Sequence, residues 1–304
     1  MSYLGGLIKE IINKASQGES VAGAMHAYKA EIEKQLITLY LSSDLRVFDK
    51  DKGGILRGPV NSRKYEVQQN GKILIGCDPK YIKDNKLEVP YSRALFNSRN
   101  LGIYQLIAYE APLMRKLTKN ANPEISGRQI SCDLVGINKN EICCIEVKVQ
   151  PFIEGCRPSY ALLEGFAYCV CLNWLIRINP LDLSQEIDLC CNSFDVKASN
   201  LPEKVTFAIA APIDDYFMPY WRMQGQSDEW FRRRKSETEV IESAIVNHFQ
   251  QYFAGYIAIA TPSNMIETKL VDGMSTCFIS EGTNSNSTIV QPFAKKFNNF
   301  FHEI

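Results

Sequence analysis

The 304-residue chain has few of the residues from which zinc sites are built. It contains three histidines, and its ten cysteines form no Cys-x-x-Cys pair, so the familiar zinc-site spacings are absent. The cysteines cluster instead in apolar runs, among them Cys143, Cys144, Cys169 and Cys171. This distribution is typical of the reduced, buried thiols of an intracellular protein, and it predicts a cytoplasmic location.

The chain also lacks an excess charge and a segment long enough to span a membrane. Its 34 basic residues balance 34 acidic ones, which excludes a strongly basic coat for nonspecific nucleic-acid binding but not a local basic cleft. The longest apolar stretch, Gly165–Ile176, is too short to cross a bilayer. Lys9 and Glu10 interrupt the apolar pattern near the N-terminus, which is therefore no signal peptide. A membrane partner is not expected.

Residues 130–149 contain two apolar runs joined by a short polar turn. Val, Ile, Leu and Cys dominate both runs, which predicts two strands. If Lys139 and Asn140 form a two-residue loop, Asp133 lies opposite Glu146, and the alternation of strand side chains puts Lys148 on the same face. Two carboxylates and one ammonium then converge on one patch of an otherwise apolar hairpin.

Such a patch has a chemical use. Neighbouring carboxylates repel each other, and burial raises the cost of their charged forms, so a divalent cation would stabilise them. Mg²⁺ takes oxygen ligands and keeps several waters, so one or two carboxylates suffice to hold it. The metal can polarise a phosphoryl oxygen and lower the pKa of a bound water, while a lysine orients that water or neutralises the developing charge. The patch predicts metal-dependent hydrolysis of a phosphate ester.

The spacing alone is a weak signal, because an acidic residue stands two positions before a lysine at five places. Only the pair in the hairpin lies inside a strongly apolar run with an acid across the loop. The alternative is an amphipathic hairpin whose polar face lies in water, although an ordinary solvent-facing strand would alternate more evenly. The five pairs are Asp78/Lys80, Asp84/Lys86, Glu146/Lys148, Asp195/Lys197 and Glu267/Lys269.

Asp133, followed after a hairpin by Glu146-Val147-Lys148, resembles the PD-(D/E)xK phosphodiesterase superfamily, which includes many restriction endonucleases and RecB-like nucleases. Cys132 stands where the motif has its proline, a position that varies widely in the superfamily. The superfamily core runs helix, three strands, helix, strand, and the resemblance covers roughly residues 95–212. The expected segments are a helix at 99–118, the hairpin at 130–149, a helix at 159–178 and a buried strand at 205–211.

The resemblance also implies a set of site residues. Asp133 and Glu146 would bind Mg²⁺, or Mn²⁺ as its substitute, together with the carbonyl of Val147. Lys148 would position or activate the attacking water. In the family an acid on the first helix often joins the site, and Glu110 fits that place and would complete or orient it.

The assignment of Glu110 depends on a helix around it. Glu110 interrupts an apolar helical stripe formed by Leu106, Leu113 and Leu117, and a charge on a core-facing stripe needs a partner or a metal. The alternative is a rotated helix that exposes Glu110. Pro112 should also kink the helix or end it near Glu110.

Several further residues are candidates for substrate binding. Glu164 and Tyr168 match the spacing of a Gln and a Tyr on the second helix of RecB-like members, with Glu in place of Gln, and the competing interpretation of Tyr168 is a packing residue. Arg157, and Arg232 and Arg233 in a run of four positive charges, are candidate phosphate contacts. The run can equally be a solvated turn of helix.

The expected fold class is α/β, with a restriction-endonuclease-like core (α-β-β-β-α-β) whose mixed central sheet is flanked by helices. Residues 1–94 form an N-terminal α+β region that contains a hairpin at Asn70-Gly71 and serves recognition, dimerisation or completion of the core. Residues 95–265 form the catalytic core, including a helix at 228–253. Residues 266–304 form a C-terminal helical extension, with a packed helix or subunit contact expected at 293–301. Strand-like runs are nevertheless expected at 256–260, 269–271 and 276–279.

The leading interpretation is a Mg²⁺-dependent nuclease that hydrolyses phosphodiester bonds of nucleic acid, DNA before RNA, in restriction, defence or repair. One alternative is a nucleic-acid-binding or structural protein that keeps the fold without catalysis. Another is an unrelated regulatory protein in which the hairpin pattern is a coincidence. Family members that cut both strands often pair as dimers, so a homodimer is a further expectation.

Overall fold

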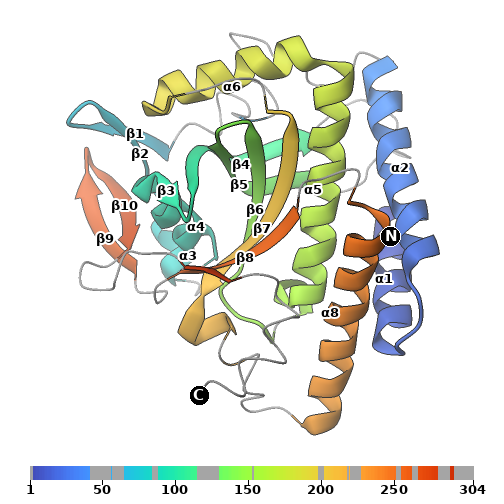
Figure 1. Cartoon of the computed structure of the whole chain (residues 1–304). Coiled ribbons are helices and arrows are strands. Elements are labelled where there is room, and N and C mark those ends of the chain that lie inside the picture. The colour runs from blue at the N-terminus through green and yellow to red at the C-terminus, as the bar shows by residue number, and fades with distance from the viewer. Residues whose placement is uncertain are drawn as a thin grey trace.

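The apolar runs of the sequence build one central sheet of seven strands in the order β11-β8-β7-β6-β5-β4-β3, as the computed structural model in Figure 1 shows. Neighbouring strands from β3 to β6 are antiparallel, whereas β6, β7 and β8 are parallel. Strand β11 is an edge strand and is antiparallel to β8. The strands are β3 (Asn100–Leu101), β4 (Tyr104–Met114), β5 (Ile130–Asn138), β6 (Glu141–Val147), β7 (Lys204–Pro212), β8 (Gly255–Thr261) and β11 (Thr288–Val290). The structure describes residues 3–41, 56, 65–83, 88–114, 130–152, 154–197, 202–217, 219, 227–250, 255–261, 266–279 and 288–290.

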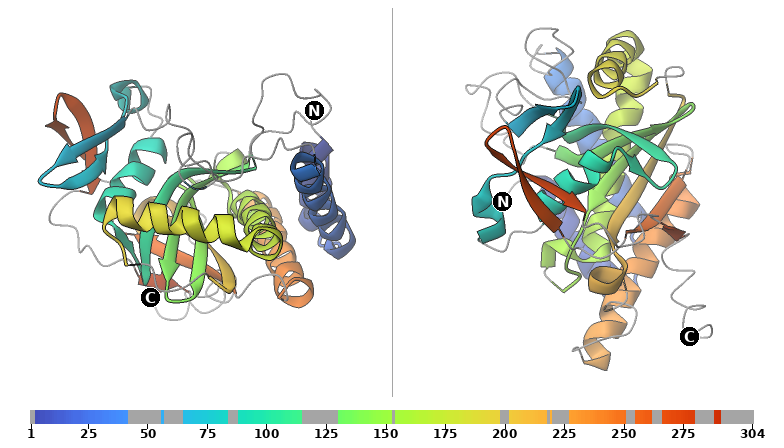
Figure 2. Two further views of the ribbon diagram at one scale, coloured as in Figure 1. Left: turned by 90° about the horizontal axis from the view of Figure 1, so that it is seen from above. Right: turned by 90° about the vertical axis from the view of Figure 1, so that its left-hand side faces the viewer.

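Helices cover this sheet and make the fold mixed α/β. Helix α5 lies against β7 on one side and against α2 and α8 on the other, and α1 completes the outer layer with α2 and α8 (Figures 1 and 2). The helices are α1 (Tyr3–Ser16), α2 (Ala22–Leu41), α3 (Pro79–Lys83), α4 (Glu88–Ser98), α5 (Pro158–Ile178), α6 (Pro180–Phe194) and α8 (Asp228–His248), with a 3-10 turn η3 (Glu154–Cys156) and a π turn η4 (Ile213–Phe217).

Helix α5 carries the connection from β6 to the parallel strand β7, and parallel neighbours require such a crossover. Pro158 occupies its first turn, where the missing N–H costs no hydrogen bond. By length and composition α5 could cross a membrane, but 72% of its most apolar window is buried inside this fold. A helix that packs on two sides must be apolar all round, so burial in the core accounts for its composition.

Two small hairpins lie side by side at one edge of the molecule and join segments from opposite ends of the sequence (Figure 2). They are β1 (Glu66–Gln69) with β2 (Lys72–Ile75), and β9 (Ile266–Val271) with β10 (Met274–Ile279). Gly76 pairs with Thr276, and the Cys77 amide donates to the Ser275 carbonyl at 2.6 Å. Asn70 and Gly71 both have positive φ, 51° and 77°, as a two-residue hairpin turn requires.

The helix predicted at 99–118 is wrong. Residues 100–114 form β3 and β4, and the helix before the hairpin is α4. Strand β4 is buried on both faces, so its apolar residues do not alternate and their spacing also fits a helix. Glu110 has a φ of 46°, between two register shifts of β4 against β5, which displace the pattern further.

The strand-like runs predicted at 256–260, 269–271 and 276–279 are confirmed as parts of β8, β9 and β10. The helical character predicted for the C-terminal extension is wrong for its described residues, because 266–279 form β9 and β10 and 288–290 form β11. The segment predicted at 293–301 lies outside the described residues. The hairpin at Asn70-Gly71 and the helix predicted at 159–178 are confirmed, as is the strand at 205–211. The division at 94 and 265 stays a prediction, although α4, which begins at Glu88, packs on β4.

The close packing of α5 on β7 gives a test of this architecture. A Cβ at Gly165 would collide with the ring of Phe207, so we expect Gly165→Ala to lower the free energy of unfolding by about 1–3 kcal/mol. Gly23 of α2 has open space around it, and Gly23→Ala should leave stability unchanged or raise it by up to about 1 kcal/mol. Urea denaturation of both variants measures the difference. Equal effects would contradict the α5–β7 packing.

Candidate metal centre

The hairpin of β5 and β6 places its two carboxylates as the sequence predicts. Asn138 pairs with Glu141 and Leu134 with Ile145, so the next position sets Asp133 opposite Glu146. The backbone amide of Val147 donates to Oδ2 of Asp133 at 2.8 Å and fixes that carboxylate beside the end of β6. The Glu146 side chain is only 5% exposed, so this acid lies inside the fold.

A third carboxylate comes from Glu88, the first residue of α4. Single oxygens of Glu88, Asp133 and Glu146 all lie within 4.8 Å of one another. Because the Glu88 side chain is 34% exposed, it forms the solvent-facing side of the group. Helix α4 packs on β5 and β6, and this contact brings a residue from outside the hairpin to its polar face.

Glu110 does not belong to this group. It lies on β4, its side chain is 39% exposed, and one carboxylate oxygen accepts from Arg93 at 2.7 Å. Arg93 is buried and also donates to the Gly76 carbonyl, so the pair ties α4 and β4 to the small hairpins. The place predicted for Glu110, an acid on the first helix, is taken by Glu88.

Lys148 lies between carboxylates from three elements. Its Nζ is 2.5 Å from Oε1 of Glu146, 3.3 Å from Glu88 and 3.1 Å from Glu164 on α5. Its side chain is 5% exposed. Burial lowers the pKa of an ammonium, but the attraction of Glu146, Glu164 and Glu88 outweighs this and raises the Lys148 pKa well above its usual value. Lys148 therefore carries a positive charge at neutral pH.

Helix α5 also contributes Tyr168, whose hydroxyl donates to Oε2 of Glu146 at 2.7 Å. Glu146 thus accepts from Lys148 through one oxygen and from Tyr168 through the other. Glu164 and Tyr168 are four residues apart on one helix face, as the sequence predicts, and both reach the polar patch of the hairpin. The orientation of Glu146 is set by donors on either side of it.

The crowding of acids perturbs their pKa values. Burial, and then the charge of Glu146, raise the pKa of Asp133 and that of Glu164, the latter to about 8. Burial raises the pKa of Glu88 as well, although Lys148 opposes the shift. Were all these acids ionised, the group would hold more negative charge than one lysine balances, so the raised pKa values favour the protonated forms, and a bound cation would favour the ionised ones.

The three carboxylates fit a small divalent cation. Two oxygens on one Mg²⁺ are about 3.0 Å apart when adjacent and about 4.2 Å apart when opposite, because each bond is about 2.1 Å long. The oxygens of Glu88, Asp133 and Glu146 lie within 4.8 Å of one another, so side-chain adjustment of the order of 1–2 Å would bring them to a common ion. Val147 is shown to contact Asp133 through its amide, and a role for its carbonyl stays a prediction.

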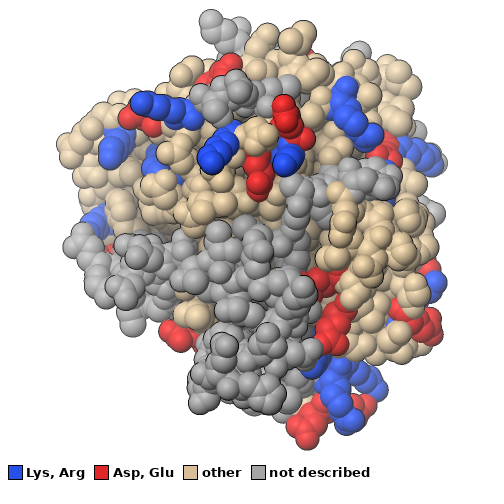
Figure 3. Space-filling model, viewed as in Figure 1, with Lys and Arg blue, Asp and Glu red and all other residues tan. Residues whose placement is uncertain are grey.

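Two of the predicted phosphate-binding arginines pair with acids of α8. Arg157 is buried, with one guanidinium nitrogen 3.7 Å from Glu237 of α8. Arg232 and Arg233 are exposed on α8, where Arg233 pairs with Glu229 at 2.7 Å. Figure 3 shows basic and acidic side chains interspersed over one face of the molecule, with a group of basic ones at the lower end.

Glu88 is the site residue that the sequence analysis missed. It stands in the first turn of a helix with Pro90 close behind, and an acid followed by proline is a recognised sign of a helix start. That sign would have located α4 and its acid. It would not have placed Glu88 beside Asp133, because the two are brought together only by packing between α4 and the hairpin.

Comparison with known proteins adds no assignment to this geometry. No protein-family model, no curated protein and no solved structure matches the chain. The interpretation of the site therefore depends on the positions and chemistry of its own residues.

The predicted acid, Glu110, and the acid that the structure places beside Asp133, Glu88, can be compared in a matched test. We expect Glu88→Gln to weaken Mn²⁺ binding at least about tenfold in titration calorimetry, since it removes a charged oxygen ligand from a hard cation. Glu110→Gln makes the same chemical change on a carboxylate paired with Arg93 and should leave the affinity within about twofold. A larger loss in Glu110→Gln would contradict the assignment.

Proposed function

We propose that this chain is a nuclease that hydrolyses phosphodiester bonds of nucleic acid, DNA in the first instance, with Mg²⁺ or Mn²⁺ held by Glu88, Asp133 and Glu146. The observation that carries the proposal is the convergence of three carboxylate oxygens within 4.8 Å beside the buried ammonium of Lys148. Hydrolysis of a phosphodiester needs a site that receives negative charge, and a divalent cation with a fixed ammonium supplies one.

The order of elements around the site supports a restriction-endonuclease-like core. Helix α4, strands β4, β5 and β6, helix α5 and strand β7 occur in the order helix, three strands, helix, strand, with the two-residue β3 inserted after α4 and helix α6 inserted after α5. The acids and the lysine come from the start of α4, the hairpin and the middle of α5. This agrees with the PD-(D/E)xK resemblance of the sequence, with Glu88 in the role first given to Glu110.

Each side chain has a distinct task in this proposal. A bound cation would lower the pKa of a water and polarise a phosphoryl oxygen. The ammonium of Lys148 orients the attacking water and offsets charge on the phosphate. Tyr168 holds the Glu146 carboxylate in place through its hydrogen bond, and Glu164 holds Lys148 through their ion pair. Glu88 and Glu164 are about a third exposed, so they border the side from which a substrate enters.

A second candidate is a nucleic-acid-binding or structural protein that has kept the fold without catalysis. The close contacts of Lys148 with three carboxylates favour it, because they neutralise part of the acidic charge without a metal. In that case the chain would bind nucleic acid and cleave none with any divalent metal.

The setting of the reaction follows from the same proposal. The ten cysteines are free thiols and most are buried, as expected for the cytoplasm. The target is nucleic acid rather than a membrane component, and restriction, defence and repair remain the roles to test. A homodimer stays a prediction for an enzyme that cuts both strands.

Cleavage of plasmid DNA with Mg²⁺ or Mn²⁺ tests the proposal. We expect Asp133→Asn, which keeps the shape of the side chain, and Lys148→Ala to lower the nicking rate about 10²–10³-fold, because each removes electrostatic stabilisation of the transition state. Lys269→Ala is the control, since Lys269 pairs with Glu267 at the same spacing but lies half-exposed on β9.

Melting temperatures show whether the variants are folded. EDTA should stop cleavage by the wild-type protein. Retained nicking in folded Asp133→Asn and Lys148→Ala would contradict the site assignment. Loss of nicking in Lys269→Ala would show that the assay does not report on this centre. Binding of DNA without cleavage by the wild type would favour the second candidate.

A further inference from the structure

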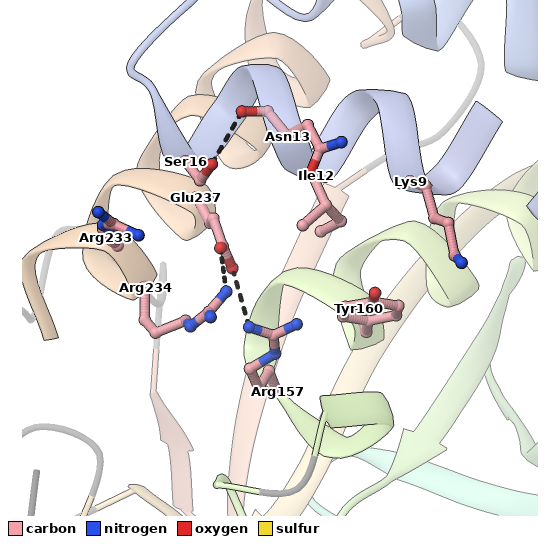
Figure 4. A pocket seen from close by; sticks show the side chains of 9 residues that line it. All are labelled: Lys9, Ile12, Asn13, Ser16, Arg157, Tyr160, Arg233, Arg234 and Glu237. Atoms are coloured by element: carbon pink, nitrogen blue, oxygen red, sulfur yellow. Dashed lines mark hydrogen bonds and ion pairs between the residues drawn. The ribbon is translucent and has the colours of Figure 1, made fainter. Parts of the chain in front are cut away.

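A pocket of about 320 Å³ lies outside the carboxylate group, where α1, the start of α5 and α8 meet. Figure 4 shows its side chains and the three helices from which they come. Helices α1 and α8 lie outside the six-element core discussed above, so the pocket is built by parts of the chain that the proposed catalysis does not use. It is lined by Lys9, Ile12, Asn13, Ser16, Arg157, Tyr160, Arg233, Arg234 and Glu237.

The lining is strongly basic although the whole chain is neutral. Four basic side chains and one carboxylate, that of Glu237, line it. Arg157 and Arg234 both point at Glu237, as Figure 4 shows. Lys9 and Arg233 lie on the exposed rim, where Arg233 also pairs with Glu229. Arg157 and Arg234 are largely buried, so solvent screens their charges less than on an open surface.

The pocket lies next to the candidate metal centre along the chain and in space. Arg157 follows Cys156 directly, and Sγ of Cys156 is 4.0 Å from Oε2 of Glu88. The hydroxyl of Tyr216 donates to the Cys156 carbonyl at 2.7 Å and fixes this junction. Seven residues separate Arg157 from Glu164 on α5, a rise of roughly 10 Å at 1.5 Å per residue.

We propose that this pocket binds a phosphate group of the nucleic acid at a position flanking the bond that is cut. The proposal rests on the proposed function and adds a second anchoring point for the substrate. Along the axis of a duplex the phosphates of one strand advance by about 3.4 Å per nucleotide. A rise of roughly 10 Å between Arg157 and Glu164 therefore corresponds to a few nucleotides between the two anchoring points.

The chemistry of the lining selects phosphate among anions. Arginine presents a planar fork of donors that matches two phosphate oxygens, and lysine adds a point charge. The ring of Tyr160, with Arg157 5.1 Å from its centroid, gives the pocket a flat wall beside these donors. Phosphate contacts of this kind position a nucleic acid without reading its sequence, which suits a site that flanks the reacting bond.

The test compares two double variants that remove equal charge. Lys9→Ala with Arg233→Ala alters the rim of the pocket and leaves the buried Arg157–Glu237–Arg234 contacts in place. Lys34→Ala with Lys269→Ala is the control, because Lys34 lies exposed on α2, Lys269 is half-exposed on β9, and neither lines the pocket. Binding of a fluorescent 20-nucleotide DNA is measured in EDTA, so that cleavage plays no part.

We expect the pocket variant to raise Kd at least about tenfold and to lower the slope of log Kd against log salt by about one, since one phosphate contact is lost. The control should stay within about twofold. Equal losses in the two variants, or none in either, would overturn the proposal. A 5′-phosphate on the DNA that strengthens binding only when the pocket is intact would assign the site to a terminal phosphate, whereas no dependence would assign it to an internal one.

Further outcomes distinguish this proposal from free phosphate as the ligand and from the proposed nuclease function. Inorganic phosphate that stabilises the wild type against heat, while the pocket variant binds DNA normally, would make free phosphate the ligand and overturn the nucleic-acid assignment. If the protein cleaves DNA but the pocket variant binds it as the wild type does, the pocket fails and the nuclease stands. If the pocket variant loses binding but the wild type never cleaves, the pocket stands and the nuclease fails.

Discussion

The attraction between one buried ammonium and the carboxylates around it is the interaction on which the centre of this protein depends. Lys148 contacts acids from α4, β6 and α5, so the charge of one side chain links three elements that meet at the end of the sheet. A buried charge without a partner would cost several kcal/mol, about 3–5 in typical cases, and its removal would leave the acids unbalanced. The arrangement is stable only when all of these elements are in place.

The same contacts limit which positions on Glu146 a cation can bind. Both oxygens of Glu146 already accept a hydrogen bond, one from Lys148 and one from Tyr168. Each carboxylate oxygen offers two acceptor positions, so a metal can share Glu146 with these donors. The hydrogen bond from Tyr168 then orients the acid for the metal, in the way that outer partners of metal ligands commonly do.

The sequence predicts those parts of the fold that local patterns encode. The β5–β6 register follows from alternation and a two-residue loop, and α5 from its apolar run and the proline at its start. The error at 99–118 arises because β4 is buried on both faces and bulged at Glu110, so its apolar spacing carries no strand period. Glu88 could not be assigned, because nothing local connects it to Asp133 and the contact exists only after α4 packs on the hairpin. The basic pocket was missed for the same reason, since Lys9 and Arg157 line one pocket only because α1 packs beside α8.

The pairing of the two small hairpins has a consequence for the way the protein is made. Helix α4, which carries Glu88, packs against β10, and Asn97 near its end donates to the carbonyls of Ile75 and Cys277. Strand β10 follows the β5–β6 hairpin in the chain and is therefore made after it. The helix that supplies Glu88 gains its full support only once β10 has been made and has folded against it. A growing chain would carry Asp133, Glu146 and Lys148 before the packing that holds Glu88 is complete, so the three carboxylates come together late in folding.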